Sequence, residues 1–499
     1  MFNSVFGKKL ILSSLLLLGA CGGGGGGGTS TSVPTSAPVP PGISSSGTVT
    51  GFGSVYVNGV KFNISSTTKI SNDDVDDGEV ITENDLKVGD VVEVKGTSDD
   101  AANANAQSIE MASEVKGPVD NVFNAATKTL VVMGQTILIN NNTAIDNNIG
   151  PNGLGDLKVG DLVEVHGFRD ATGNIVATRI ERQGAVAKFR VRGNISALNS
   201  AAKTFKIGNL TVDYSAAQVV PTGTVLADGM RVRVKADSAP VAGKLMATKV
   251  KVKKAEATNN SEVEGFITMF TSATNFEVNG QKITTDANTR FEHGSAADLK
   301  VGVSVEVEGP QTDTVLTARK IEFKAGGDNN HNNSASTKFA GLVASASLAD
   351  KTITVLGQKF NVTATTMFED KVNNTRPFNI TNFNSVVKTG AHVQISAFKD
   401  GAGLTATRVE LNNKAEIFVQ GSLAAGATGT KLVISGVEVT IDTGTRFFLD
   451  DNRLADFAAF QVKALAGAIV KVKTKAMVLP ADTRIDATGT NQGEVEIED

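Results

Sequence analysis

The residue types that most often carry catalysis or hold metals are scarce in this sequence. The chain of 499 residues contains four histidines, one cysteine and no tryptophan. No histidine pair has the spacing of an H-E-x-x-H zinc site, and neither a phosphate-binding loop nor a G-x-S-x-G nucleophile turn occurs in a strand–turn–helix setting. His166 stands on an expected strand where related stretches carry Lys, Glu or Ser, so we expect a histidine on the outer surface. We predict a protein without enzymatic activity or cofactor.

An acidic run, NDDVDDGE, has the composition of a calcium-binding loop, because carboxylates in a loop suit a hard cation. Its carboxylates belong to Asp73, Asp74, Asp76, Asp77 and Glu79. With Gly78 as the sixth residue of an EF-hand loop, Val75 occupies the third position, where an oxygen ligand belongs, and Asn84 stands where a bidentate Glu is required. We therefore predict a solvated acidic loop and no specific metal site, with calcium as the alternative.

Basic residues gather in the segment 188–254, which carries 13 Lys and Arg against 3 Asp. Nine of them alternate with Val or Phe along three expected strands. Because side chains alternate between the two faces of a strand, these nine should share outward faces in contact with solvent. The nine residues, called the basic face below, are Lys188, Arg190, Arg192, Arg231, Arg233, Lys235, Lys249, Lys251 and Lys253.

Two interpretations of the basic face are open. It could bind a polyanion, such as lipopolysaccharide, acidic polysaccharide or extracellular DNA. It could instead dock on an acidic neighbour and fix the order of the domains. The acidic candidates in the next segment are Glu262, Glu264, Glu306 and Glu308. Tyr214 is the single Tyr or Trp of the basic segment, which argues against nucleic acid because single-strand binding uses aromatic platforms. We favour docking or plain solvation over a ligand.

The elements that must position these residues recur along the chain. The stretch DLKVGDVVEVKG at 85–96 returns as DLKVGDLVEVHG at 156–167 and as DLKVGVSVEVEG at 298–309. Weaker copies occupy 226–236, 387–397 and 465–475. Each copy is surrounded by short alternating apolar runs, which predict strands, and by turn signals such as Asn-Gly, which predict hairpins. The chain therefore reads as six copies of one module.

Within each module we expect Leu86 and Val88, or their counterparts, to fill the core and Gly89-Asp90 to turn into the fourth strand. The prediction is an all-β chain of six tandem, small, five-stranded antiparallel β-barrel modules, OB-like in outline. The expected modules are 47–113, 114–186, 187–254 (basic), 260–324 (acidic), 337–413 and 414–485. A polar linker at 325–336, a helix at 455–467 and a frayed acidic tail at 486–499 complete the expected chain. Modules of this size are marginal alone, which is compatible with docking or with a flexible string.

The N-terminus has the pattern of an exported lipoprotein. Two lysines precede an apolar run at 10–19 that is too short to span a bilayer. The sequence Leu-Gly-Ala-Cys at 18–21 resembles a bacterial lipobox, which implies removal of residues 1–20 and attachment of lipid to Cys21, the only cysteine. Residues 21–46, rich in Gly and then in Ser, Thr and Pro, predict a tether. By the same resemblance, we expect an anchor in the outer membrane, facing the periplasm or the cell surface.

The pattern G-x-V … V-N-G … D-L-K-V-G-D-x-V-E-V-x-G … A-x-x-I-E resembles the bacterial repeat family known as domain of unknown function 5666. The match is close in the first, second and fourth modules and looser in the others. The resemblance implies OB-type barrels in exported proteins and lipoproteins, and it brings no catalytic residues. We expect a non-enzymatic envelope lipoprotein, a binding or structural module held at the membrane by its lipid. Its candidate partners are an envelope polysaccharide or protein, and the net charge of −4 predicts no strong attraction to nucleic acid.

Overall fold

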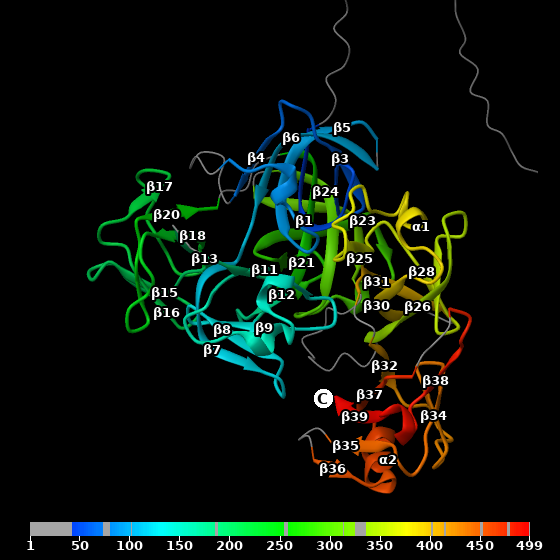
Figure 1. The fold of residues 1–499 in the computed structure, drawn as a ribbon. Coiled ribbons are helices and arrows are strands. Elements are labelled where there is room, and N and C mark those ends of the chain that lie inside the picture. Colours follow the sequence, from blue (N-terminus) through cyan, green and yellow to red (C-terminus); the bar gives the residue numbers. More distant parts are fainter. Residues whose placement is uncertain are drawn as a thin grey trace, which may run out of the picture. The chain divides into compact units, whose positions relative to one another are not determined.

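Strands dominate the computed structural model of the protein (Figure 1). The structure describes residues 42–498 except 73–79, 101, 185–187, 254–257, 313, 325–335, 401–402, 414–415, 450–452 and 477–479. Within these ranges the α-helices are α1 (Phe383–Val386) and α2 (Phe457–Leu465). The expected all-β class is confirmed, and α2 confirms the helix expected at 455–467.

The first barrel shows the plan on which the others are built. It consists of β1 (Gly42–Phe52), β2 (Val55–Val57), β3 (Val60–Asn63), β4 (Lys69–Asn72), β5 (Val91–Ser98) and β6 (Asn103–Met111). The ring runs β1-β2-β3-β6-β5 and returns to β1, and β4 adds to β6. Five strands cannot alternate direction around a closed ring, so one neighbouring pair must be parallel, and this pair is β3 with β6. Asn58 and Gly59 both have positive φ, as the predicted tight turn requires.

Three further barrels follow this plan closely. The second consists of β7 (Val115–Asn124), β8 (Thr129–Val132), β9 (Gln135–Leu138), β10 (Ala144–Ile145), β11 (Leu162–Arg169) and β12 (Ile175–Gln183). The fourth consists of β21 (Thr258–Ser272), β22 (Asn275–Val278), β23 (Gln281–Glu292), β24 (Ser304–Thr312) and β25 (Val315–Phe323). The fifth consists of β26 (Ser336–Ser347), β27 (Thr352–Val355), β28 (Gln358–Asn361), β29 (Met367–Asp370), β30 (His392–Asp400) and β31 (Gly403–Leu411).

The third and sixth barrels have split strands. The third consists of β13 (Phe189–Asn194), β14 (Ser196–Asn199), β15 (Thr204–Ile207), β16 (Leu210–Asp213), β17 (Gln218–Val220), β18 (Arg231–Ala236), β19 (Lys244–Met246) and β20 (Lys249–Val252). The sixth consists of β32 (Ile417–Ser422), β33 (Lys431–Ile434), β34 (Val437–Thr440), β35 (Arg446–Phe448), β36 (Leu454–Ala455), β37 (Ile469–Thr474), β38 (Arg484–Asp486) and β39 (Glu494–Glu498). In both, the fifth strand of the plan is made of two pieces.

The expected fraying of the acidic tail at 486–499 is wrong. Its end forms β39, which pairs with β37 and β35 and supplies the second half of the fifth strand of the sixth barrel. Val495 and Ile497 are buried, while Glu496 and Glu498 face Lys471. The alternation of apolar and acidic residues therefore belongs to a half-buried strand. At the other end, β1 begins at Gly42, inside the segment expected to be tether.

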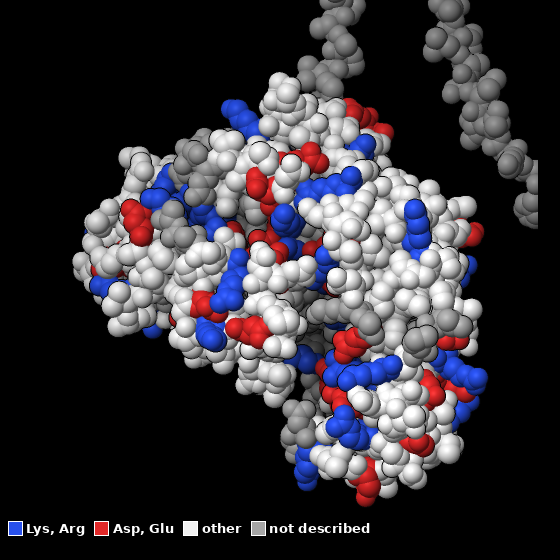
Figure 2. Space-filling view, in the orientation of Figure 1, with Lys and Arg blue, Asp and Glu red and all other residues white. Residues whose placement is uncertain are grey.

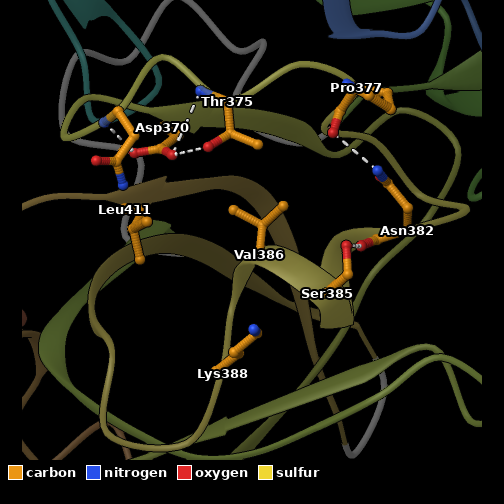
Figure 3. Close-up of a pocket in the computed structure, with 9 residues that line it drawn as sticks. Asp370, Thr375, Pro377, Asn382, Ser385, Val386, Lys388 and Leu411 are labelled. Carbon is orange, nitrogen blue, oxygen red and sulfur yellow. Dashed lines mark hydrogen bonds between the residues drawn. The ribbon is translucent and has the colours of Figure 1, made fainter.

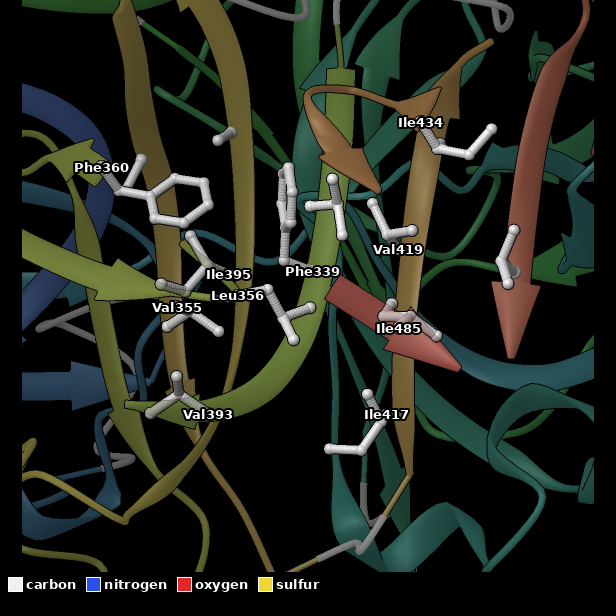
Figure 4. Packing of buried hydrophobic residues seen from close by; sticks show 14 of the residues in the cluster. Phe339, Val355, Leu356, Phe360, Val393, Ile395, Ile417, Val419, Ile434 and Ile485 are labelled. Carbon is white, nitrogen blue, oxygen red and sulfur yellow. The ribbon is translucent and has the colours of Figure 1, made fainter. Parts of the chain in front are cut away.

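Apolar residues that alternate along the strands fill each barrel. Leu86, Leu157 and Leu299, the leucines of the three close motif copies, are all buried in the cores of their own barrels, as predicted. The cores of the fifth and sixth barrels are continuous, and Figure 4 shows Phe339 between Phe360 of the same barrel and Val419 of the sixth. Docking thus extends the hydrophobic core beyond one barrel, which a module of this size needs for stability.

The six first strands pair in three couples, which join the barrels two by two. β1 pairs in parallel with β21, β7 pairs with β13 in antiparallel fashion, and β26 pairs likewise with β32. The couples are therefore the first barrel with the fourth, the second with the third, and the fifth with the sixth. Because each first strand also closes its own ring, the backbone of one barrel continues directly into the sheet of another. All described residues belong to one unit, Pro40–Asp499.

Candidate functional site

Charged side chains meet where the first, second and fifth barrels touch. Asp90 comes from the turn before β5 of the first barrel, His166 and Arg179 come from β11 and β12 of the second, and Glu369 and Arg408 come from β29 and β31 of the fifth. These five residues are called the three-barrel junction below. All five come from strands or from the turn that opens one, so rigid elements position them.

Asp90 and His166 are the most deeply buried ionisable pair of this junction, since both are 0% exposed. The Val91 amide donates to Nδ1 of His166 at 3.2 Å, so the neutral ring carries its hydrogen on Nε2. That atom lies 3.6 Å from Oδ1 of Asp90. Burial raises the pKa of Asp90 to about 6, although His166 and Arg179 favour its ionised form. The expectation of a surface histidine is wrong, because the first barrel covers this face of β11.

Arg179 connects three barrels through its guanidinium group. Its Nη1 donates to the Val88 carbonyl of the first barrel and to Glu369 of the fifth, each at 3.1 Å. Its other nitrogens bind Asp146 at 2.5 Å and Glu181, both of the second barrel. Burial disfavours the charge, but the surrounding carboxylates outweigh burial and raise the pKa of Arg179. A buried guanidinium group contributes to stability only when its N–H donors have hydrogen-bond partners, because these contacts offset the free energy of removing the charge from water.

The charges alternate in sign from the second barrel into the fifth. Glu369 binds both Arg179 and Arg408, and Arg408 also contacts Glu410 at 2.7 Å. Glu410 in turn lies 3.2 Å from the Lys371 ammonium, which donates to a backbone carbonyl of the second barrel at 2.7 Å. Each buried charge therefore lies between opposite charges, which is the condition under which burying ions is tolerated.

A connector of the fifth barrel adds a second contact with the first. The guanidinium of Arg376 stacks 3.6 Å over the ring of Phe52 and donates to the carbonyls of Glu83 and Leu86. Asn379 donates to the Phe52 carbonyl at 2.6 Å. The unusual length of this connector, between the third and fourth strands of the plan, is visible in the sequence. Its role in docking is not, because its partner residues precede it by about 300 positions.

A histidine beside a carboxylate could serve in general acid–base catalysis, provided that a substrate reaches it. Asp90 and His166 are closed off by two barrels, and neither side chain has an exposed surface. Within the described ranges, no group of three or more His, Cys, Asp or Glu side chains could hold a metal ion. The side chains of the junction therefore make their contacts with one another and with the backbone of the neighbouring barrels.

The structure places most of the basic face against carboxylates of the first and second barrels. Arg233 binds Glu110 at 2.5 Å and Lys253 binds Glu93 at 2.7 Å, both in the first barrel. Arg192 lies 3.5 Å from Glu93. Burial alone would raise the pKa of Glu93, but Lys253 and Arg192 hold it below its usual range. The charges of this interface are thus complementary.

Two other members of the basic face contact the second barrel. Arg231 binds Glu114 at 2.7 Å, and Arg190 lies 3.9 Å from Glu164. Arg190 also donates to Asn72 of the first barrel at 2.9 Å. The remaining members are Lys188, which pairs with Asp237 of its own barrel, and Lys235, Lys249 and Lys251, each of which has an interaction. Figure 2 shows Lys and Arg interspersed with Asp and Glu on the face drawn.

The docking partner of the basic face differs from the one we expected. Glu262, Glu264, Glu306 and Glu308 of the fourth barrel were the expected partners. Instead, Glu262 accepts a hydrogen bond from Ser45 of the first barrel at 2.8 Å, and Glu306 binds Lys324 of its own barrel at 2.6 Å. The carboxylates that the basic face contacts therefore belong to the first and second barrels, and not to the acidic strands of its successor in the sequence.

Glu262 lies at the interface of the first and fourth barrels among other charged groups. On the neighbouring strands, β24 carries Glu306 and Glu308 and β25 carries Lys320. Burial and Glu306 raise the pKa of Glu262 to about 8. The folded protein therefore keeps a proton that the unfolded chain releases near pH 4.5. The stability contributed by this proton is complete below that pH and is lost as the pH rises through about 8.

The substitution Glu262→Gln is expected to remove this pH dependence, because the amide is neutral and still accepts from Ser45. The variant should match the wild type near about pH 5 and exceed its free energy of unfolding by about 2–4 kcal/mol at about pH 9. Urea unfolding followed by circular dichroism at both pH values measures the difference. Glu277→Gln, at a partly exposed position on β22 of the same barrel, is the control and should retain the wild-type change of stability with pH. If the free energy of unfolding changed with pH as much in Glu262→Gln as in the wild type, Glu262 would not be the group that titrates near pH 8.

The fifth barrel carries a pocket of about 450 Å³ beside its long connector (Figure 3). Its lining residues are Asp370, Asn373, Thr375, Pro377, Asn382, Ser385, Val386, Lys388 and Leu411. The Asp370 carboxylate accepts from the Thr375 hydroxyl at 2.5 Å and from the backbone amides of Val372 and Asn373. Asn382 donates to the Pro377 carbonyl at 2.8 Å. These polar groups are thus used to hold the connector in shape.

Several residues singled out in the sequence lie outside the described ranges. These are Cys21 with the leader 1–20 and the first part of the tether, the acidic run Asp73, Asp74, Asp76, Asp77 and Glu79, and most of the linker 325–336. In the described part of the chain, no helix has the length and apolar character that crossing a membrane requires.

Five segments of the chain match the family described as "Domain of unknown function (DUF5666)". They are residues 44–110, 116–181, 192–251, 264–322 and 340–410, which together make up more than half of the sequence. Each segment falls on one of the first five barrels. No curated protein matches the chain.

Proposed function

Given that this chain belongs to the DUF5666 family of tandem repeats, we propose that it is a non-enzymatic structural and binding protein of the bacterial cell envelope. In this proposal, lipid on Cys21 holds it at the outer membrane, and its barrels dock into one fixed arrangement that presents binding surfaces to a protein or polysaccharide of the envelope. The tether at 21–41 supplies the reach between the lipid and the first strand.

The observation that carries the proposal is the three-barrel junction. Arg179 makes hydrogen bonds to the first and fifth barrels while it is 2% exposed. A flexible string of barrels would leave such groups in water, where they need no partners. Buried charged groups with hydrogen-bond partners on other barrels favour one fixed arrangement of the barrels. Separation of the barrels would break several of these charged hydrogen bonds at once.

Two alternatives receive less support. Polyanion binding by the basic face would have to displace the carboxylates of Glu93, Glu110 and Glu114, which already lie against its cations. An enzymatic role for Asp90 and His166 would require a route to a pair that has no exposed surface. The proposal therefore assigns both groups of residues to docking.

The anchor is tested by metabolic labelling with palmitate. The wild-type protein should incorporate label and sediment with membranes, while Cys21→Ser should lose the label, because the lipobox resemblance leaves this thiol as the only site for lipid. A second variant, Ser46→Cys in the Cys21→Ser background, controls for the presence of a cysteine as such and should remain unlabelled. Label that persists in Cys21→Ser would contradict the lipid anchor.

A further inference from the structure

A lysine without a counter-ion lies where the second, fifth and sixth barrels meet. Lys338 belongs to β26, and its register partners are Ser396 on β30 and Gln420 on β32. Phe339, the next residue along β26, packs in the core, so the three polar side chains lie together on the outer face of the joined sheets. Ser396 donates to the Asn141 carbonyl at 2.8 Å, so the second barrel covers this face.

Most of the charges around Lys338 are positive. The row of side chains continues to Arg408 on β31 at one end and to Lys471 on β37 at the other. The carboxylate that attracts Lys338 is Glu410, but Arg408 and Lys371 already bind it at 2.7 and 3.2 Å. Among the described residues, the Lys338 ammonium has no ion pair and no hydrogen bond, so its charge is not balanced by a neighbour of its own.

These surroundings disfavour the ammonium form and leave a neutral amine. Burial, together with repulsion by the three neighbouring cations, lowers the pKa of Lys338 to about 8, although Glu410 favours the charge. At about pH 8 half of the molecules therefore carry the uncharged amine, roughly 150-fold more than for an exposed lysine of pKa 10.5. A neutral amine has a free lone pair, so Lys338 is a nucleophile at a pH where other lysines are protonated.

The same cations favour a negative charge at this position. When a neutral amine adds to carbon dioxide, its lone pair forms an N–C bond, one C=O π bond becomes a C–O⁻ group, and a proton leaves the nitrogen for water. The product is a carbamate, and an anion among three cations replaces a group that they repel. Gln420 is 5% exposed, and within the described ranges its amide has no hydrogen-bond partner. Its N–H groups would gain an acceptor in the carbamate.

We propose that Lys338 is a modification site, at which carbon dioxide adds reversibly to the side-chain nitrogen and forms a carbamate. The modification supplies the counter-ion that Lys338, Arg408 and Lys471 lack between them, at the place where the fifth and sixth barrels join and the second barrel covers the sheet. Carbon dioxide then stabilises the contact between these barrels. The inference goes beyond the proposed function and depends neither on the lipid anchor nor on an envelope partner.

The test is ¹³C nuclear magnetic resonance of the full chain in ¹³C-labelled bicarbonate at about pH 8. The wild type should show a carbamate resonance that disappears on exchange into unlabelled buffer. Lys338→Arg should lose this resonance, because arginine keeps the positive charge and does not add carbon dioxide. Lys359→Arg, at an exposed position of the same barrel, is the matched control and should retain it. A resonance from the N-terminal amine would be common to all three proteins.

Chemical trapping of the wild type locates the carbamate without any substitution. Triethyloxonium converts a carbamate into a stable ethyl ester, and mass spectrometry of the peptides should place that group on Lys338. This measurement stays decisive if Lys338→Arg fails to fold. Trapping that leaves Lys338 unmodified, or a carbamate resonance that is equally strong in Lys338→Arg, would overturn the inference.

Discussion

Replacement of Arg179 by alanine should lower the free energy of unfolding by about 3–5 kcal/mol, because Asp146 and Glu181 lose the buried cation that they share, and Glu369 keeps only Arg408. The Val88 carbonyl of the first barrel would lose its donor as well. We expect the loss in the first urea-induced transition seen by far-ultraviolet circular dichroism, because a barrel that no longer docks loses neighbours that its small core needs and unfolds at lower urea.

Arg182→Ala is the matched control for this experiment. Arg182 lies three residues further along β12, its side chain is 37% exposed, and it pairs with Asp161 of its own barrel. Exposed pairs of this kind contribute less than about 1 kcal/mol. A similar shift in the two variants would mean that the buried contacts between barrels contribute no more than a surface pair, and the account of the three-barrel junction would be wrong.

The substitution Gly89→Ala should be nearly as damaging, by about 3 kcal/mol, because the new methyl group would lie 2.8 Å from the Thr178 carbonyl. Gly160→Ala supplies an unusually close control. The two glycines stand at the same place in the same motif and have the same backbone conformation, so both variants pay about 1 kcal/mol for positive φ. The methyl group at 160 meets nothing.

Both glycine variants strain the backbone equally, so the difference between their free energies of unfolding measures the docking contact alone. Urea unfolding of both proteins in one buffer measures it. If Gly160→Ala proved as destabilising as Gly89→Ala, the turn of the first barrel would be a local structural element with no part in docking.

The interior of each barrel was predictable from the sequence because it depends on local patterns. The alternation of apolar and polar residues predicted the strands, and Asn58-Gly59 predicted a hairpin turn, whose two residues have positive φ. The leucine of each close motif copy fills a core, as predicted. Val88 and Val159 show where this reasoning ends. Identical neighbours surround them in the sequence, yet one is buried and the other is exposed, because the difference lies in a second barrel.

The contacts between barrels could not be derived from one sequence. We expected the basic third barrel to meet its successor, the acidic fourth, because both charge patterns are plain in the sequence. The backbone pairing of β7 with β13 and of β1 with β21 decides the neighbours instead, and these strands have no distinctive composition. The prediction for His166 was wrong for the same reason. Its side chain points to the outside of the second barrel, and the first barrel covers that surface.

The acidic tail had a signal that could have been used. Glu494, Glu496 and Glu498 alternate with two apolar residues, as in the other fifth strands. The preceding stretch, ADTRID at 481–486, also fits the fifth strand, and the plan has one such strand in each module. The structure divides that strand between β38 and β39, with a 3₁₀ turn at Gly489–Asn491 between them.

The central claim is that the barrels are held in one arrangement, and the distance between two of them tests it most directly. Because Cys21 is the only cysteine, a protein with Cys21→Ser, Val122→Cys and Lys388→Cys carries two cysteines for nitroxide labels. The two labelled positions are exposed, one in the second barrel and one in the fifth. Double electron–electron resonance should give one narrow distance distribution, which Arg179→Ala should broaden. A broad distribution in the protein without that change would contradict docking and describe a flexible string of barrels.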